Sequence, residues 1–282
     1  MNVAVEEAVG EKQRRLRAVL AEMGSVVVAF SAGVDSTVVL KVALEVLGRE
    51  RVLAATGVSP SLATRELESV KELAGLIDAP LELVGTDEVN NPDYAANPTN
   101  RCYHCKTELY TRLTGLAKAR GFAAVVNGVN ADDVGDWRPG MKAAAEWAVR
   151  APLLEAGLTK GDVRAVAREL GLPNWSKPAL ACLSSRVPYG TPVTVGVLSQ
   201  IERAEAFLYE RGFTEFRVRH HQRVARIEAS LGDMRRLMED DALRGAVVSA
   251  FKELGYTYIS LDLQGFRSGS GNEGLNVVAG PR

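Results

Sequence analysis

Short apolar runs alternate with longer amphipathic stretches over about the first 180 residues of the chain. Within the longer stretches, apolar residues recur every three or four positions, which is the spacing of a helix with one buried face. Runs that are apolar throughout are typical of parallel strands that are buried on both sides. The pattern predicts an α/β fold, a parallel sheet with helices on both faces. The predicted strands are residues 26–30, 52–56, 81–84 and 123–127, and the predicted helices are residues 35–47, 61–77 and 103–120.

The pattern changes after residue 172, where prolines punctuate a segment without clear periodicity. Beyond it, residues 195–211 have helical spacing, and two short alternating runs are joined by a tight turn near His221 and Gln222. Such runs pair as antiparallel strands, so we expect a smaller α+β domain. We therefore predict two domains, residues 1–178 and residues 179–282. The predicted strands of the second domain are residues 215–220, 224–229 and 257–261.

Composition limits the classes of partner. The chain has 282 residues, 34 basic and 35 acidic, so its formal net charge is -1. This balance provides no global field for a nucleic-acid backbone or an anionic membrane, and we expect neither as a partner. The N-terminus does not have the pattern of a secretory signal, and no apolar run approaches the roughly 20 residues of a membrane span. We expect a cytoplasmic protein.

A loop of small residues follows the first predicted strand and opens the first predicted helix. Gly33 permits a left-handed or closely approached backbone, and hydroxyl groups lie beside the free amides of the helix start. Such a helix terminus is an anion site. The alternative is an ordinary strand-to-helix turn in which Asp35 and Ser36 cap the helix. The candidate phosphate-binding residues are Ser31, Gly33, Asp35, Ser36 and Thr37.

The loop lacks the lysine of the common nucleoside-triphosphate P-loop. It resembles the Ser-Gly-Gly-x-Asp-Ser pyrophosphate loop (PP-loop) of the ATP-pyrophosphatase family, with Ala32 in place of the first glycine. The resemblance implies an adenine nucleotide α-hydrolase-like fold and an enzyme that cuts ATP between its α and β phosphates. It also implies Mg²⁺ on the phosphates, for which Asp35 is a candidate ligand.

A second polar loop follows the fourth predicted strand, at residues 128–140. Ligands of parallel sheets bind beyond the carboxyl ends of the strands, where this loop carries Asp132, Asp133, Asp136 and Arg138. A solvated turn would explain its glycine and asparagine residues but would make no use of the acids. We take Gly128, Asp132 and Arg138 as further candidate ATP-binding residues.

Several further segments resemble the sulfur transferases that build the nickel-pincer nucleotide cofactor of lactate racemase, and the likeness covers nearly the whole chain. The resemblance implies ATP-dependent conversion of the carboxylates of pyridinium-3,5-biscarboxylic acid mononucleotide to thiocarboxylates through an acyl-adenylate. Its implied partners are this small molecule, a sulfide donor and the downstream nickel-insertion protein, and we expect a homo-oligomer. The segments are Asn127-Gly128, Asp132-Asp133, Arg138-Pro139-Gly140, Lys177-Pro178, residues 182–190 (CLSSRVPYG) and residues 261–269 (LDLQGFRSG).

The three cysteines, an odd number, indicate metal ligation or thiol chemistry rather than disulfides. Cys182 lies beside Ser185 and Arg186, and a cationic neighbour favours a thiolate. With Cys102 and Cys105, it resembles the three-cysteine branch of the family, which implies a 4Fe–4S cluster with one iron open to sulfide. In another branch the matching cysteine gives up its own sulfur. Structural zinc, a redox dithiol and inert thiols are the other interpretations.

Arginines alternate with apolar residues in the first strand of the predicted hairpin. Arg217 and Arg219 therefore share a face, and pairing would place Arg226 and Glu228 on the same face. Guanidinium groups bind phosphates and carboxylates. The alternative is that this is a solvent-exposed strand face, which often carries charged residues without a binding function. The candidate substrate-binding residues are Ser185, Arg186, Arg217, Arg219, Arg226 and Glu228, and the candidate catalytic residues are Cys182, Asp35, Arg217 and Arg219.

Three other functions remain open at this point. A transfer-RNA thiolase would share the loop and the cysteines but should need an extended basic surface. In an amidating ATP-pyrophosphatase the cysteines would be incidental. A non-catalytic nucleotide-binding or cluster-carrier protein would release no pyrophosphate. The glycine-rich residues 269–274 match the dinucleotide-binding pattern, but no βαβ unit can follow them, so we interpret them as a loop.

Overall fold

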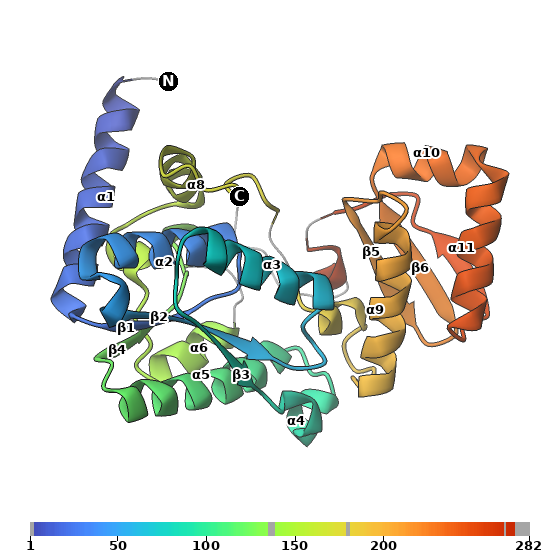
Figure 1. The fold of residues 1–282 in the computed structure, drawn as a ribbon. Helices are drawn as coiled ribbons and strands as arrows, with labels where there is room; N and C mark the ends of the chain where they lie inside the picture. The colour runs from blue at the N-terminus through green and yellow to red at the C-terminus, as the bar shows by residue number, and fades with distance from the viewer. Residues whose placement is uncertain (1–2, 135–138, 179–180, 268, 274–282) are drawn as a thin grey trace. The chain divides into compact units, whose positions relative to one another are not determined.

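The computed structural model describes residues 3–134, 139–178, 181–267 and 269–273 (Figure 1). The chain forms two compact units. The first comprises Met1–Ser59, Thr64–Glu88 and Asn100–Leu180, and the second comprises Pro60–Ala63, Val89–Thr99 and Ala181–Arg282. The predicted domains placed residues 60–63 and 89–99 with the N-terminal part, whereas their contacts join them to the C-terminal part.

A parallel sheet of four strands forms the centre of the first unit, in the order β3-β2-β1-β4. The valine-rich strand β1 and the first five residues of β2 are largely buried, because side chains alternate across the sheet and helices cover each side, whereas the residues of the edge strand β3 are partly or fully exposed. The predicted parallel α/β fold is confirmed. The strands are β1 (Val26–Ala29), β2 (Val52–Val58), β3 (Leu81–Gly85) and β4 (Ala124–Val126).

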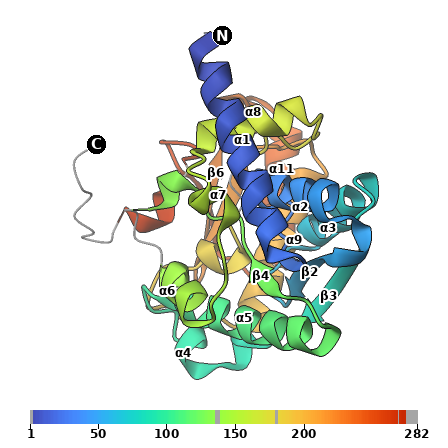
Figure 2. The same cartoon turned by 90° about the vertical axis from the view of Figure 1, so that its left-hand side faces the viewer.

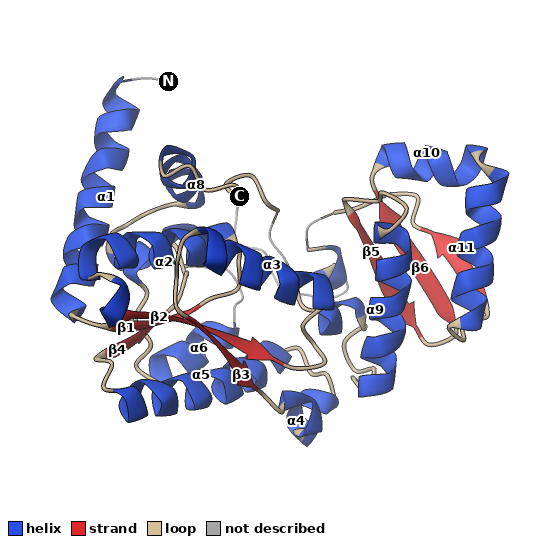
Figure 3. Cartoon of the chain, viewed as in Figure 1, coloured by secondary structure: helices blue, strands red, loops and turns tan. Residues whose placement is uncertain are grey.

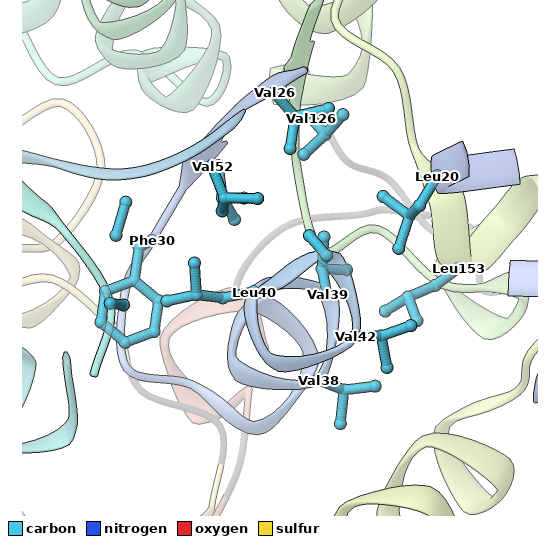
Figure 4. Close-up of a cluster of buried hydrophobic side chains, with 14 of the residues drawn as sticks. Leu20, Val26, Phe30, Val38, Val39, Leu40, Val42, Val52, Val126 and Leu153 are labelled. Atoms are coloured by element: carbon cyan, nitrogen blue, oxygen red, sulfur yellow. The ribbon is translucent and has the colours of Figure 1, made fainter. Parts of the chain in front are cut away.

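Helices cover both faces of this sheet (Figures 2 and 3). Val26 of β1 lies in a buried cluster with Leu20 and with Leu40 of α2 (Val34–Leu47) (Figure 4). Val28 of β1 belongs to the same cluster. Val27, on the opposite face, packs toward α5 (Arg101–Arg120). The other helices of this unit are α1 (Val3–Met23), α3 (Thr64–Leu76), α6 (Pro139–Glu146), α7 (Pro152–Glu155) and α8 (Lys160–Glu169).

The second unit contains a three-stranded sheet in the order β5-β6-β7. The strands β5 (Phe216–His221) and β6 (Val224–Ala229) pair antiparallel, as predicted, and β7 (Tyr258–Leu261) pairs parallel to β6. Phe216 and Val218 belong to this unit's core, so the arginines between them lie on the opposite face. The helices are α4 (Pro92–Ala95), α9 (Val195–Tyr209), α10 (Leu231–Glu239) and α11 (Asp241–Glu253).

Among the described helices, none combines the length and the apolar character that crossing a membrane requires.

Candidate active site

The loop after β1 leaves the start of α2 open. Gly33 is the N-cap of α2, and at this position it supplies no side-chain cap hydrogen bond. The alternative in which Asp35 and Ser36 cap the helix is therefore wrong, since both lie inside it. The amides of the first turn of this 14-residue helix retain the partial positive charge that favours an anion.

Ala32, rather than Gly33, adopts the left-handed backbone in this loop. The φ angle of Ala32 is 54°, and that of Gly33 is -76°. Of the two possibilities for Gly33, a left-handed or a closely approached backbone, the structure supports the second, because a Cβ at Gly33 would lie 3.3 Å from the hydroxyl of Ser31. An alanine with positive φ costs on the order of 1 kcal/mol, so the loop holds Ala32 in a strained conformation.

The two hydroxyl groups inside α2 bind the loop itself. Ser36 donates to the carbonyl oxygen of Gly33 at 3.1 Å, and its Oγ lies 3.2 Å from the Oγ of Ser31. Thr37 is fully buried and donates to the same carbonyl at 2.9 Å. Asn174 donates from Nδ2 to Thr37 and to the carbonyl of Ala32. Thr37 and Asn174 thus hold the loop in shape, while Ser31 remains exposed.

Asp35 contacts a lysine that was not among the predicted site residues. Its carboxylate forms an ion pair with Lys160 and accepts a hydrogen bond from Asn130 at 3.2 Å. The backbone amide of Lys160 also donates to Asp132 at 2.8 Å. Lys160 is the first residue of α8, whose start has a capping box formed by Thr159 and Asp162. That Thr-x-x-Asp spacing is visible in the sequence and could have located the helix start.

Gly128 brings the loop after β4 against the phosphate loop. A Cβ at Gly128 would lie 2.7 Å from the backbone nitrogen of Ser36 and 3.0 Å from the carbonyl carbon of Asp35. These are backbone atoms, which cannot move aside, so only glycine allows this close approach. The structure thus brings Gly128, Asp132 and Asp35 together. Asp136 and Arg138 lie outside the described residues.

The thiol of Cys182 is exposed at the start of a short 3₁₀ turn, Leu183–Arg186. Arg186 is buried and forms a bidentate ion pair with Glu205. It also donates to the carbonyl oxygens of Ala181 and Cys182, at 2.6 and 3.1 Å. Its guanidinium group is therefore committed to the protein, so the prediction that Arg186 binds the substrate directly is not supported by its surroundings. Ser185 is partly exposed, and its hydroxyl accepts from Arg186.

The predicted arginine face of β5 and β6 exists, but most of its side chains are buried from solvent. In the register of the two strands, Arg217 lies opposite Glu228, and Arg219 lies opposite Arg226. Glu228 is 0% exposed and receives both arms of Arg219 at 3.0 Å. Arg226 is half-buried and bridges Glu228 and Asp262. Glu228 is thus a buried counter-ion, and its surroundings do not favour the predicted role in substrate binding. The alternative of a merely solvated face is wrong, because Arg217, Arg219 and Glu228 are buried.

Arg217 differs from its neighbours because it has no carboxylate within ion-pair distance among the described residues. It is 7% exposed, and it stacks over the ring of Phe266 at 4.9 Å. Burial, together with the nearby positive charges of Arg219 and Arg186, lowers the pKa of Arg217 to about 10. A bound anion would offset both effects. The geometry therefore favours Arg217 as the anion-binding arginine of this face.

The C-terminal segment covers the arginine face, which the sequence did not predict. The hydroxyl of Ser270 accepts from Arg219 at 2.6 Å and donates to Glu228 at 2.9 Å. A Cβ at Gly271 would lie 3.3 Å from a guanidinium nitrogen of Arg219. Residues 269–273 indeed form no dinucleotide loop but a short 3₁₀ turn, Ser270–Asn272, that completes the packing around Arg219.

The Cys-x-x-Cys pair lies in the first turns of α5, in the first unit. Cys102 is exposed and Cys105 is partly buried. Residues three apart share one helix face. Cys182 belongs to the second unit, so the convergence of the three thiols stays a prediction. Within the described residues, no group of three or more His, Cys, Asp or Glu side chains is arranged to hold a metal ion.

No protein-family model matches the chain. The chain is 46% identical over 264 residues to an uncharacterised protein of Synechocystis sp.. The aligned region covers 94% of this chain and 98% of that protein. It is 41% identical over 267 residues to the pyridinium-3,5-bisthiocarboxylic acid mononucleotide synthase of Lactiplantibacillus plantarum, spanning 94% and 95%. An uncharacterised protein of Methanocaldococcus jannaschii is 25% identical over 243 residues, spanning 86% and 91%. The similarity to the synthase therefore extends over both units.

Proposed function

This chain belongs to the family of the pyridinium-3,5-bisthiocarboxylic acid mononucleotide synthase, and we propose that it catalyses the same sulfur transfer. The substrate is pyridinium-3,5-biscarboxylic acid mononucleotide, whose carboxylates become thiocarboxylates. ATP supplies the activation, because a carboxylate is a poor electrophile until a good leaving group replaces one oxygen. The observation that carries this proposal is 41% identity over 95% of the length of the synthase.

In the first step, a substrate carboxylate oxygen attacks the α-phosphorus of ATP, and the bond to the β-phosphate breaks. The product is an acyl-adenylate, and pyrophosphate leaves. The open amides of α2 are suited to bind the pyrophosphate. Lys160 is paired with Asp35 at this helix start, and its ammonium group would stabilise the charge that accumulates on the leaving oxygen.

The acidic side chains beside the phosphate loop fit a magnesium ion. The two carboxylate oxygens of Asp35 each accept one hydrogen bond, from Asn130 and from Lys160. Each oxygen keeps a further lone pair, and the carboxylate of Asp132 meets the same lysine. Asp35 and Asp132 would therefore hold Mg²⁺, which would supply charge neutralisation on the phosphates.

In the second step, a sulfur nucleophile attacks the acyl carbon and AMP leaves. We propose that Cys102, Cys105 and Cys182 hold a 4Fe–4S cluster, which would supply bound sulfide. Thiolates are the ligands that such clusters require, and the three thiols are exposed or partly exposed. The alternative is that Cys182 gives up its own sulfur and becomes dehydroalanine. Both versions require Cys182 beside the adenylated carboxylate.

The substrate is an anion, and Arg217 is the buried cation best suited to hold its phosphate or a carboxylate. Arg219 and Arg186 each have a carboxylate partner already. They add positive potential without being free to move toward a ligand. We propose that this enzyme is cytoplasmic and that it delivers its product to a nickel-insertion protein.

Product analysis after anaerobic incubation with ATP and the biscarboxylic mononucleotide tests the proposal. We expect AMP, pyrophosphate and a thiocarboxylate whose mass is higher by the difference between sulfur and oxygen. Asp35→Asn should lower pyrophosphate release by roughly 100-fold, in the range found when one charge-stabilising group of an active site is removed. Asp78→Asn, at a carboxylate that is 85% exposed in the same unit, is the matched control. ADP and phosphate as products, or no nucleotide cleavage, would contradict the proposal.

A further inference from the structure

Two segments from the N-terminal half hold the loop that carries Cys182. Residues 60–63 and 89–99 belong to the same unit as this loop, although about 90 to 120 positions separate them from it in the chain. The repeating strand-helix pattern of the first unit does not predict that either segment belongs to the second unit. Their contacts converge on residues 183–193, directly after the cysteine.

The first of these contacts is a closed ring of three hydroxyl groups. The phenol of Tyr94 lies 2.7 Å from the hydroxyl of Ser61 and 2.6 Å from that of Ser184. The two serine hydroxyls are 3.1 Å apart. All three residues are buried. Each hydroxyl can donate one hydrogen bond and accept another within the ring, so the ring joins three separate segments in a place that water does not reach.

Backbone contacts extend this attachment along the loop. The amide of Leu183 donates to the carbonyl of Ser61 at 2.9 Å. Asn97 is fully buried, and its Nδ2 donates to the carbonyls of Pro188 and Thr191 at 2.8 Å each. A φ of 56° at Asn97 is a left-handed conformation that asparagine tolerates better than most residues.

The other side of the loop is fixed by arginines. Arg186 holds the carbonyls of Ala181 and Cys182, and Arg219 holds the carbonyl of Ser185 at 2.7 Å. The backbone around Cys182 is therefore bonded on both sides, while the thiol itself is exposed. This combination suits a group that must meet a reacting carbon, because misplacement by about 1 Å can cost roughly 100-fold in rate.

We propose that Tyr94 is a positioning residue for sulfur transfer: through Ser61 and Ser184 it holds Cys182 where the activated carboxylate is attacked. The proposal rests on the function proposed above. It applies whether Cys182 ligates a cluster or donates its own sulfur. Tyr94 is 1% exposed and therefore touches no reacting atom. Because the ring is attached to the loop of Cys182, its effect belongs to the second step and not to adenylation.

The test is Tyr94→Phe, which keeps the buried ring and removes only the hydroxyl. We expect thiocarboxylate formation to fall roughly tenfold, the equivalent of one to two neutral hydrogen bonds. Pyrophosphate release and the KM for ATP should be unchanged. Amide exchange of residues 181–191 should become faster. In iron-free protein, where no shared cluster couples the thiols, the rate of Cys182 alkylation, read by peptide mass spectrometry, should change, while the rates at Cys102 and Cys105 stay constant as internal controls.

Tyr256→Phe is the matched control, because it also removes a buried phenol hydroxyl from this unit. Tyr256 bonds to His220 at 3.2 Å and not to the cysteine loop. It should leave sulfur transfer and loop exchange unchanged. Ser61→Ala, which removes a second member of the ring from another segment, should reproduce the pattern of Tyr94→Phe.

Three outcomes would overturn the proposal. These are unchanged sulfur transfer in Tyr94→Phe, an equal fall in pyrophosphate release and sulfur transfer, or an equal effect of Tyr256→Phe. Failure of the proposed function is a different result, since wild-type protein would then release no pyrophosphate. The exchange and alkylation measurements still decide in that case whether Tyr94 fixes the loop.

Discussion

Arg217 and Arg219 lie two positions apart on the same strand face, yet their surroundings differ in charge. Arg219 is paired in bidentate fashion with the fully buried Glu228. Among the described residues, the contacts of Arg217 are a weak 3.5 Å hydrogen bond to the carbonyl of Arg267 and stacking over the ring of Phe266. Removal of one partner of a buried ion pair destabilises the protein, because the other charge stays buried without compensation. A buried arginine without a carboxylate partner can instead bind an external anion.

We therefore predict opposite effects for the two arginines. Arg217→Met should leave the free energy of unfolding nearly unchanged and weaken substrate binding by about 1.5–3 kcal/mol, the range for hydrogen bonds to charged groups. Arg219→Met should destabilise the protein by about 3–5 kcal/mol, because it leaves Glu228 buried without its main partner. Urea unfolding and substrate titration measure the two quantities.

The double change Arg219→Met with Glu228→Met is the control for this interpretation. Removal of both charges should recover most of the stability lost in Arg219→Met. ATP affinity should be the same in every variant. Equal loss of ATP affinity and substrate affinity in Arg217→Met would contradict the assignment of Arg217 to the substrate site.

At the level of elements, the proposed nucleotide site depends on how closely the loop after β4 approaches the start of α2. Gly128→Ala would place a Cβ 2.7 Å from the backbone nitrogen of Ser36. The helix start would have to shift, so we predict a loss of about 1–3 kcal/mol in unfolding free energy, the usual range for overpacking. Pyrophosphate release should fall more than this stability loss explains, because the displaced amides are those that we propose bind the phosphates.

Gly115→Ala in α5 is the matched control in the same unit. Among the described residues, no atom outside the adjacent backbone of its own helix lies within 4 Å of the added Cβ. Alanine in a helix interior is more stable than glycine by roughly 0.5–1 kcal/mol. This variant should be slightly stabilised and fully active. An active Gly128→Ala protein with normal unfolding would show that the close approach does not matter for the nucleotide.

At the level of the whole molecule, the proposed cluster mechanism and the sacrificial mechanism differ in the cysteines that they require. Cys102 and Cys105 belong to the first unit and Cys182 to the second. If the three hold one 4Fe–4S cluster, alanine at any of the three positions should remove iron and abolish sulfur transfer alike. If Cys182 donates its own sulfur, only Cys182→Ala is inactive, and the other two variants retain one turnover.

Iron and sulfide analysis of anaerobic protein and mass spectrometry after turnover distinguish these mechanisms. We expect iron in the wild-type protein and no mass loss after turnover. Iron-free protein that has lost the mass of hydrogen sulfide at Cys182 would exclude the cluster mechanism. Either outcome leaves the adenylation proposal intact, because that proposal rests on the loop before α2 and not on the cysteines.

The amino-acid sequence by itself determined the strand-helix alternation, the phosphate loop and the two-residue alternation of the arginine strand. These features are periodic or local, so the spacing of apolar residues and a few small residues suffices to predict them. The first helix, α1, was missed although Leu16, Leu20 and Met23 have helical spacing and are buried. The capping box before Lys160 was likewise visible but unused.

Only the tertiary structure decided which of the predicted site residues are available for chemistry. Lys160 and Asp35 are 125 positions apart, and the ring around Tyr94 joins three segments. Whether an arginine is paired depends on partners such as Glu205 and Glu228, whose carboxylates look like any surface acid in the sequence. Long-range contacts carry no periodic signal, and the free energy that selects them comes from burial and charge pairing in the folded chain.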